Sequence, residues 1–298
     1  MCARTSNNEK QVLTFSAFLA SLFAIGGLLL GLWVGSLVIL FDGAYSLVSL
    51  LLTLLSLLAS RYIQKPSDAD FPFGRAIIEP VVIAIKASVI LTVVAFSLYA
   101  AIAALFSGGR EIDASIATLF GLINVIGCGF GWWVIQRKSH HFSSDLIDAE
   151  AKQWQMDTLL SAAVMAGFIV AGFISRSPFA HWAVYADPLM MCIMSFYFIK
   201  VPLDMLRSST RELLMMSPSK EITELANKNV NAISAATGHP IEITGLTKVG
   251  RELRLNLNYH PKHGNTVKIE ELEHVKSQLH KRFAPTPLDL QLTLNIQH

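Results

Sequence analysis

Six long apolar runs constrain the fold of this chain more than any other feature of its sequence. A helix rises 1.5 Å per residue, so about 20 apolar residues cross the ~30 Å hydrocarbon core of a bilayer. The runs are 13–34, 36–60, 77–106, 114–135, 146–174 and 182–206. Only 15% of the residues are charged, whereas soluble domains carry about 25%. The sequence therefore predicts a polytopic α-helical membrane protein with six transmembrane helices.

The placement of Lys and Arg predicts how these helices cross the membrane. Most of the flanking basic residues fall on one side, namely Arg4, Lys10, Arg61, Lys65, Arg75, Arg137, Lys138, Lys152, Arg207 and Arg211. The other side has Arg110 and Arg176. Short loops rich in Lys and Arg stay in the cytoplasm, so we expect both termini there, in a multi-pass protein of the cell inner membrane. The net charge of +2 is too small to indicate a nucleic-acid partner.

The last third of the chain reads as a small soluble domain. Apolar residues at helical spacing follow Ser217-Pro218-Ser219, and Gly238 should end that helix. Residues 253–259 and 288–296 alternate apolar and polar side chains, as half-buried strands do. A short strand after Pro240 and a second amphipathic helix complete the pattern. We therefore predict a transmembrane domain over 1–210 and a cytoplasmic α+β domain of order α-β-β-α-β over 211–298.

Several polar residues lie at one depth in the predicted membrane helices. Asp157 is roughly 16 Å from the start of the fifth run, near the midplane, and Gln153 precedes it by one turn. Tyr45 and Ser49 lie roughly 13 to 20 Å along the second run, and Asp42 is about a turn further out. Ionisable groups inside spans are expensive and usually functional, so the five residues predict a cation site. The alternative is that Tyr, Ser and Gln only hydrogen-bond between helices.

Two further charges lie too deep to be ordinary flanking residues. Lys86 falls in the third run and Asp187 in the sixth. An unpaired buried ion is costly, so we expect these two side chains to pair, with a role in proton transfer as the second interpretation.

Four short segments, taken together and in this order, resemble the signatures of the cation diffusion facilitator family. They cover the second span, the loop after it, the fifth span and the sixth span. The segments are Phe41–Leu47, Phe71–Arg75 with the following Glu79-Pro80, Asp148–Asp157 and Tyr185–Pro188. The resemblance extends over almost the whole chain.

This resemblance implies an exporter of a divalent metal cation from the cytoplasm, which works by alternating access in exchange for protons. The metal ion and protons would be substrates, no resident cofactor is expected, and the C-terminal domain would form a homodimer. The family's transport site has Asp or His at two second-span positions, then His and Asp in the fifth span. The matching residues here are Tyr45, Ser49, Gln153 and Asp157, so only the last agrees.

Two other metal sites of the family are altered in this sequence. Many relatives bind a second metal in the loop after the second span with one Asp and two His. Asp68 remains here, but Phe71 and Arg75 take the His positions, so we predict no metal in this loop. The binuclear site of the C-terminal domain also looks largely absent, with Gln291 where relatives often carry a His.

The remaining ligand types favour a hard cation. Carboxylate, hydroxyl and amide oxygens suit Mn²⁺ or Mg²⁺, with Fe²⁺ also possible, and they disfavour zinc. The alternatives to a transporter are an inactive homologue and a membrane enzyme. The loss of three ligands would fit a transport-inactive or regulatory homologue of the same fold. A membrane enzyme would need a nucleophile–base pair or a His cluster at a membrane face, and the sequence contains neither.

Overall fold

The computed structural model describes residues 2–34, 37–65, 67–109, 114–139, 144–174, 178, 180–260, 269–286 and 288–296. The chain forms two compact units. One contains residues 1–65 and 82–207, and the other contains residues 66–81 and 208–298.

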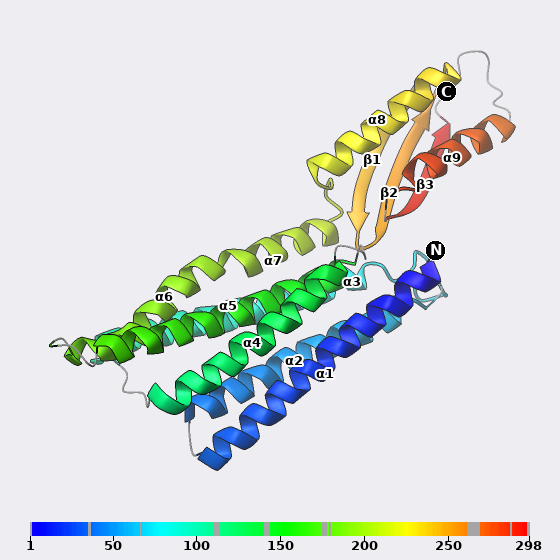
Figure 1. The fold of residues 1–298 in the computed structure, drawn as a ribbon. Coiled ribbons are helices and arrows are strands. Elements are labelled where there is room, and N and C mark those ends of the chain that lie inside the picture. The colour runs from blue at the N-terminus through cyan, green and yellow to red at the C-terminus, as the bar shows by residue number, and fades with distance from the viewer. Residues whose placement is uncertain are drawn as a thin grey trace. The chain divides into compact units, whose positions relative to one another are not determined.

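Long helices build the first unit (Figure 1). They are α1 (Cys2–Val34), α2 (Leu37–Ile63), α3 (Ile78–Phe106), α4 (Ala114–Ser139), α5 (Asp145–Ile174), the 3-10 helix η1 (Ala180–Tyr185), α6 (Ala186–Phe198) and α7 (Lys200–Leu213). The division between the units falls inside α3, before Val82, and inside α7, after Arg207. Among the described residues, four stretches are long and apolar enough to cross a membrane, in α1, α2, α3 and α5. The protein is therefore a helical membrane protein. The bounds of α2 to α5 follow the predicted runs to within a few residues, whereas α1 ends with its predicted run but begins at Cys2, well before residue 13.

The helices α1 and α2 approach each other through glycine. A Cβ built on Gly43 would lie 2.5 Å from the backbone nitrogen of Leu28 and 2.7 Å from the carbonyl carbon of Gly27. Both neighbours are backbone atoms of α1, so they cannot rotate away as a side chain could. Small residues allow membrane helices to pack at this distance, and α1 and α2 run side by side as a helical hairpin (Figure 1).

The sixth apolar run is not one uninterrupted α-helix. It begins as η1, continues as α6 and breaks at Ile199 before α7. Pro202 explains the break, because proline has no N–H to donate to the carbonyl of Phe198 and its ring crowds that carbonyl. Hydrogen bonds from Ile199 N to Ser195 O (3.0 Å) and from Leu203 N to Ile199 O (3.4 Å) keep the chain helical on both sides. The run is therefore a kinked helix.

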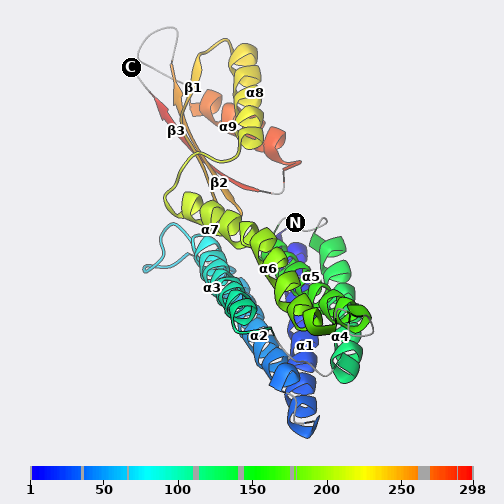
Figure 2. The ribbon, with the colours of Figure 1, turned by 90° about the vertical axis from the view of Figure 1, so that its left-hand side faces the viewer.

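The C-terminal part of the second unit is a three-stranded sheet with two helices on one face (Figure 2). Its elements are α8 (Lys220–Thr237), β1 (Ile241–Val249), β2 (Glu252–Tyr259), α9 (Ile269–Phe283) and β3 (Asp289–Ile296). The sheet order is β1-β2-β3, with β1 antiparallel and β3 parallel to the central β2. The helix α9 makes the crossover that parallel strands require. Gly238 ends α8 in the left-handed conformation (φ 70°), as its sequence predicts.

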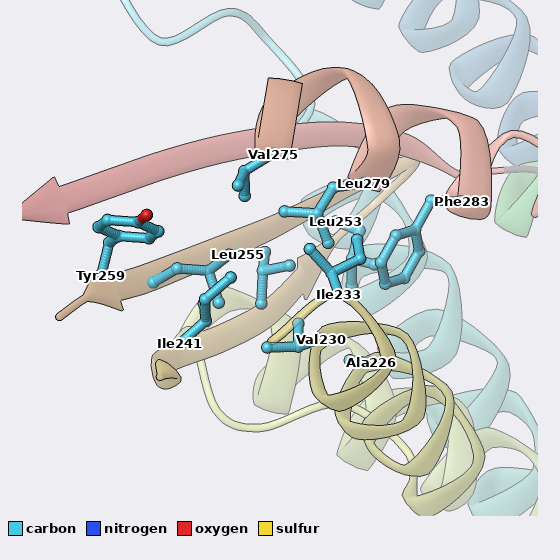
Figure 3. Close-up of a cluster of buried hydrophobic side chains, with 11 residues drawn as sticks. Ala226, Val230, Ile233, Ile241, Leu253, Leu255, Tyr259, Val275, Leu279 and Phe283 are labelled. Atoms are coloured by element: carbon cyan, nitrogen blue, oxygen red, sulfur yellow. The ribbon is translucent and has the colours of Figure 1, made fainter. Parts of the chain in front are cut away.

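The helices α8 and α9 and the sheet enclose one hydrophobic core (Figure 3). The strand β2 supplies its centre, since Leu253, Leu255, Leu257 and Tyr259 are all buried. The alternation that predicts this strand therefore reflects burial of one face of the sheet. Val230 and Ile233 of α8 close the core from one side, and the residues of α9 close it from the other.

The close contact at Gly43 gives a test of the helix pairing. We expect Gly43→Ala to destabilise the protein by roughly 1–3 kcal/mol, as overpacking of an interior does. Gly26→Ala is the matched control, because a Cβ at Gly26 meets nothing within 4 Å, and alanine favours a helix by up to about 1 kcal/mol. Thermal unfolding of the purified protein in detergent measures both. Equal melting temperatures for the two variants would contradict the packing described here.

Candidate cation site in the helical bundle

Three of the predicted site residues meet between α2 and α5. The hydroxyl of Ser49 on α2 donates to Oδ2 of Asp157 on α5 at 3.3 Å. The side-chain amide of Gln153, one turn earlier on α5, donates to the backbone oxygen of Ser49 at 3.3 Å. Ser49 contacts Asp157, and Thr53, one turn later on α2, contacts Glu150, which comes earlier on α5. The two helices therefore run antiparallel here.

All three residues are shielded from solvent. Ser49 is 8% exposed, Asp157 9% and Gln153 2%. The amide oxygen of Gln153 is buried and accepts no hydrogen bond from the part of the chain that the structure describes. A buried polar atom of this kind is rare in folded proteins and calls for a partner such as water or an ion. One carboxylate and neutral oxygens therefore lie together at this level of the bundle.

The other two predicted residues, Asp42 and Tyr45, cannot be placed in the same way. Both belong to α2, but their side chains lie outside the described residues. Their part in the site remains a prediction.

A second buried polar cluster adjoins the first. Glu150 precedes Gln153 by less than a turn on the same face of α5, and its carboxylate forms an ion pair with the Lys86 ammonium from α3. Both side chains are completely buried. The predicted pairing of Lys86 with Asp187 is therefore wrong with respect to Lys86, because Glu150 takes that place. The side chain of Asp187 lies outside the described residues.

Sequence reasoning missed Glu150 because it stands in the polar beginning of the fifth run, where acidic residues usually flank a span. Its spacing was the available signal. Glu150, Gln153 and Asp157 are three and four residues apart, which puts all three on one face of a helix. A face that carries two acids and an amide inside a membrane helix has to be buried against polar partners.

The ligand chemistry of the site is oxygen chemistry. Among the described residues, no group of three or more His, Cys, Asp or Glu side chains is placed to hold a metal ion. Asp157, Ser49 and Gln153, which we call the Asp157 site, can instead offer a carboxylate, a hydroxyl and a carboxamide oxygen. Such groups suit a hard cation that keeps part of its water shell.

The loop after α2, which belongs to the second unit, holds an ion pair at the position where many relatives bind a second metal. Arg75 pairs with the carboxylate of Asp68, and its guanidinium also lies over the Phe71 ring, 4.6 Å from the centroid. The hydrogen bond from Arg75 holds the pKa of Asp68 below its ordinary value, and the Phe71 backbone N–H acts in the same direction. Asp68 therefore carries its charge at neutral pH and loses it only as the pH falls below the usual aspartate range.

Helices that span a membrane and bury a carboxylate among neutral oxygens are features of membrane proteins that bind or conduct cations. Comparison with known proteins narrows this class. The family model described as the cation efflux transmembrane domain matches residues 13–214, which is more than half of the chain. The protein belongs to the cation efflux family, also called the cation diffusion facilitators, whose members are transporters rather than enzymes. The family resemblance of the sequence motifs is confirmed.

Individual relatives are distant. The manganese efflux system protein MneP of Bacillus subtilis is 25% identical over 209 residues, which is 70% of each chain. The magnetosome protein MamB of Magnetospirillum gryphiswaldense is 30% identical over 147 residues, 49% of this chain and 50% of that protein. The zinc transporter ZitB of Pectobacterium atrosepticum is 24% identical over 233 residues, 76% of this chain and 67% of that protein.

The Arg75–Asp68 pair generates a prediction for the loop. We expect Asp68→Asn to leave the number of Zn²⁺ or Cd²⁺ ions bound per chain unchanged, because a fixed guanidinium at the carboxylate repels a metal ion. Equilibrium dialysis of the purified protein against each metal gives this number. Loss of one bound ion on the substitution would show that the loop does hold a metal.

Proposed function

We propose that this protein exports a divalent metal cation from the cytoplasm in exchange for protons, with the Asp157 site as the place where the cation binds. The observation that carries the proposal is the meeting of Asp157, Ser49 and Gln153 between α2 and α5, with an unpaired Gln153 oxygen among the described residues. Asp42 and Tyr45 complete the proposed ligand set from α2. Membership of the cation efflux family supports transport as the activity.

The proposed cargo is a hard cation, with Mn²⁺ as the first candidate and Mg²⁺ or Fe²⁺ as others. Oxygen ligands favour these ions over zinc, which prefers His and Cys. The name of MneP, a manganese efflux protein, agrees with this choice, whereas ZitB is named a zinc transporter. At the position where the family has His, Gln153 would lower the affinity for zinc and ease release of a harder ion.

The proposed exchange with protons follows from charge. A carboxylate buried without a cation is costly, so Asp157 takes up a proton when the cation leaves and gives it up when the next one binds. In this arrangement six membrane crossings place both termini in the cytoplasm of the cell, and the inner membrane is the proposed location. The proton and the cation then compete for one carboxylate, which couples their movement.

A second candidate function is a transport-inactive or regulatory homologue of the same fold. The observation that favours it is the ligand set, since Tyr45, Ser49 and Gln153 differ from the ionisable or imidazole ligands of the family pattern. The burial of Asp157, which accepts a hydrogen bond from Ser49, favours the transporter, because a carboxylate without a role is seldom kept inside a membrane.

Substitution of Asp157 tests the transport proposal. We expect Asp157→Asn to reduce Mn²⁺ transport into proteoliposomes to the level of empty vesicles, because it removes the carboxylate that binds both ions. Asp148→Asn on the same helix is the matched control, since Asp148 is half exposed and pairs with Lys152. Gln153→His should raise zinc transport relative to Mn²⁺. Normal transport by the Asp157 variant would refute the site.

We further propose that the protein is a homodimer held in part by the domain over 211–298. That domain has a small core, and small domains gain stability by association. We expect mass measurement in mild detergent to give twice the 32.7 kDa of one chain. A monomer as the dominant species, in detergent and in lipid nanodiscs alike, would rule the dimer out.

A further inference from the structure

The buried carboxylate of Glu150 lies among oxygens that come from several helices. Its Oε1 accepts hydrogen bonds from the hydroxyls of Ser16 on α1, at 2.6 Å, and Thr53 on α2, at 2.5 Å. Lys86 on α3 places its ammonium on Oε2 of Glu150 and on the hydroxyl of Ser56, at 3.2 Å from the latter. We call the set of Glu150, Ser16, Thr53 and Ser56 the Glu150 cradle.

Every member of the Glu150 cradle is inaccessible to solvent in the bundle. The indole of Trp154 donates to the oxygen of Ser16 at 2.6 Å. Because an indole N–H can only donate, the Ser16 proton is directed to Glu150. The ammonium therefore contacts a carboxylate oxygen of Glu150 and the hydroxyl of Ser56, while Ser16 and Thr53 hold the carboxylate by its other oxygen. Carboxylate and hydroxyl oxygens are ligands that suit a small hard cation.

The Glu150 cradle lies next to the Asp157 site. Glu150 precedes Asp157 by two helical turns, roughly 10 Å along α5. Thr53 Oγ1 is 2.5 Å from Glu150 and 3.1 Å from the backbone oxygen of Ser49, and the Ser49 hydroxyl bonds to Asp157. A chain of polar groups on α2 and α5 thus joins the two carboxylates.

We propose that the Glu150 cradle is a second cation site, which the ammonium of Lys86 fills as a tethered cation. That this second site lies on the transport pathway rests on the proposed function. The lysine comes from α3, the least buried of the four candidate membrane spans, on a long side chain with a compact charge. The cation competes with Lys86 for Glu150, and the ammonium keeps this carboxylate from trapping the cargo.

A purely structural pair is the competing explanation. Buried ion pairs rarely stabilise a protein more than well-packed apolar residues would, so stability alone is a weak reason for this one. The tethered cation has an effect that a structural pair lacks. A divalent ion at Asp157 and the Lys86 ammonium repel each other, and because both side chains are buried this repulsion is screened less than it would be in water. Lys86 therefore weakens cation binding at Asp157 and assists its release.

The test is Mn²⁺ binding to the full-length protein in detergent, followed by the electron paramagnetic resonance signal of free Mn²⁺. We expect the Lys86→Met protein either to bind one more Mn²⁺ per chain than the wild type or to bind Mn²⁺ at least about tenfold more tightly than the wild type does. The double variant Lys86→Met/Glu150→Gln should return to the wild-type count, because the carboxylate is gone. Lys152→Met is the matched control, since Lys152 is partly exposed at the start of α5.

Repeating the measurement in an Asp157→Asn background separates this proposal from the proposed function. The extra ion of the Lys86 variant should persist there, whatever transport assays show for Asp157. Unchanged Mn²⁺ binding by a folded Lys86→Met protein overturns the proposal, as does an extra ion that survives Glu150→Gln. Lys86→Gln, which keeps hydrogen bonds to Glu150, replaces the Met variant if that one fails to fold. If only the double variant folds, the pair is structural and the proposal fails.

Discussion

The interior of a membrane bundle has no water to satisfy a buried polar group, so each such group has to find its partner on another helix. The helix α5 sets this requirement for the whole first unit. Its face carries Glu150, Gln153 and Asp157, all buried. The partners come from three other helices, as Ser16 of α1, the hydroxyls of α2 and the ammonium of α3. Apolar packing brings these helices together, but the polar face of α5 decides how each is rotated.

The second unit is organised by the opposite rule. Its core is apolar, and β2 is its centre because it pairs with both other strands and buries every second residue. Charged groups stay at its margins, where Lys248 pairs with Glu212 at 2.9 Å and Arg254 with Glu252 at 2.9 Å. The same chain therefore uses hydrogen-bond satisfaction to specify one unit and hydrophobic burial to specify the other.

These two rules explain what could be predicted from the sequence. Apolar runs and alternation report burial, so the long helices and the strand around Leu255 were predictable. The break at Ile199 follows from Pro202, which the sequence shows, but the hydropathy averaged over the whole run does not reveal it. The partner of Lys86 was not predictable, because helix contacts depend on rotation and depth, which periodicity along one helix does not give. Ser49 and Gln153 were found near Asp157 because their depths agree, whereas Glu150 resembled an ordinary flanking charge.

The glycine contact between α1 and α2 has a mechanical consequence. Backbone touches backbone at Gly43, so no side chain there can rearrange to let one helix slide along the other. We expect the hairpin to move as a rigid body. Any displacement of the hairpin against α5 then shears the boundary between α2 and α5, which is where Ser49 meets Asp157. Opening a path through the bundle and taking apart the proposed cation site would be the same movement, so an ion bound there would lose its ligands as its exit forms.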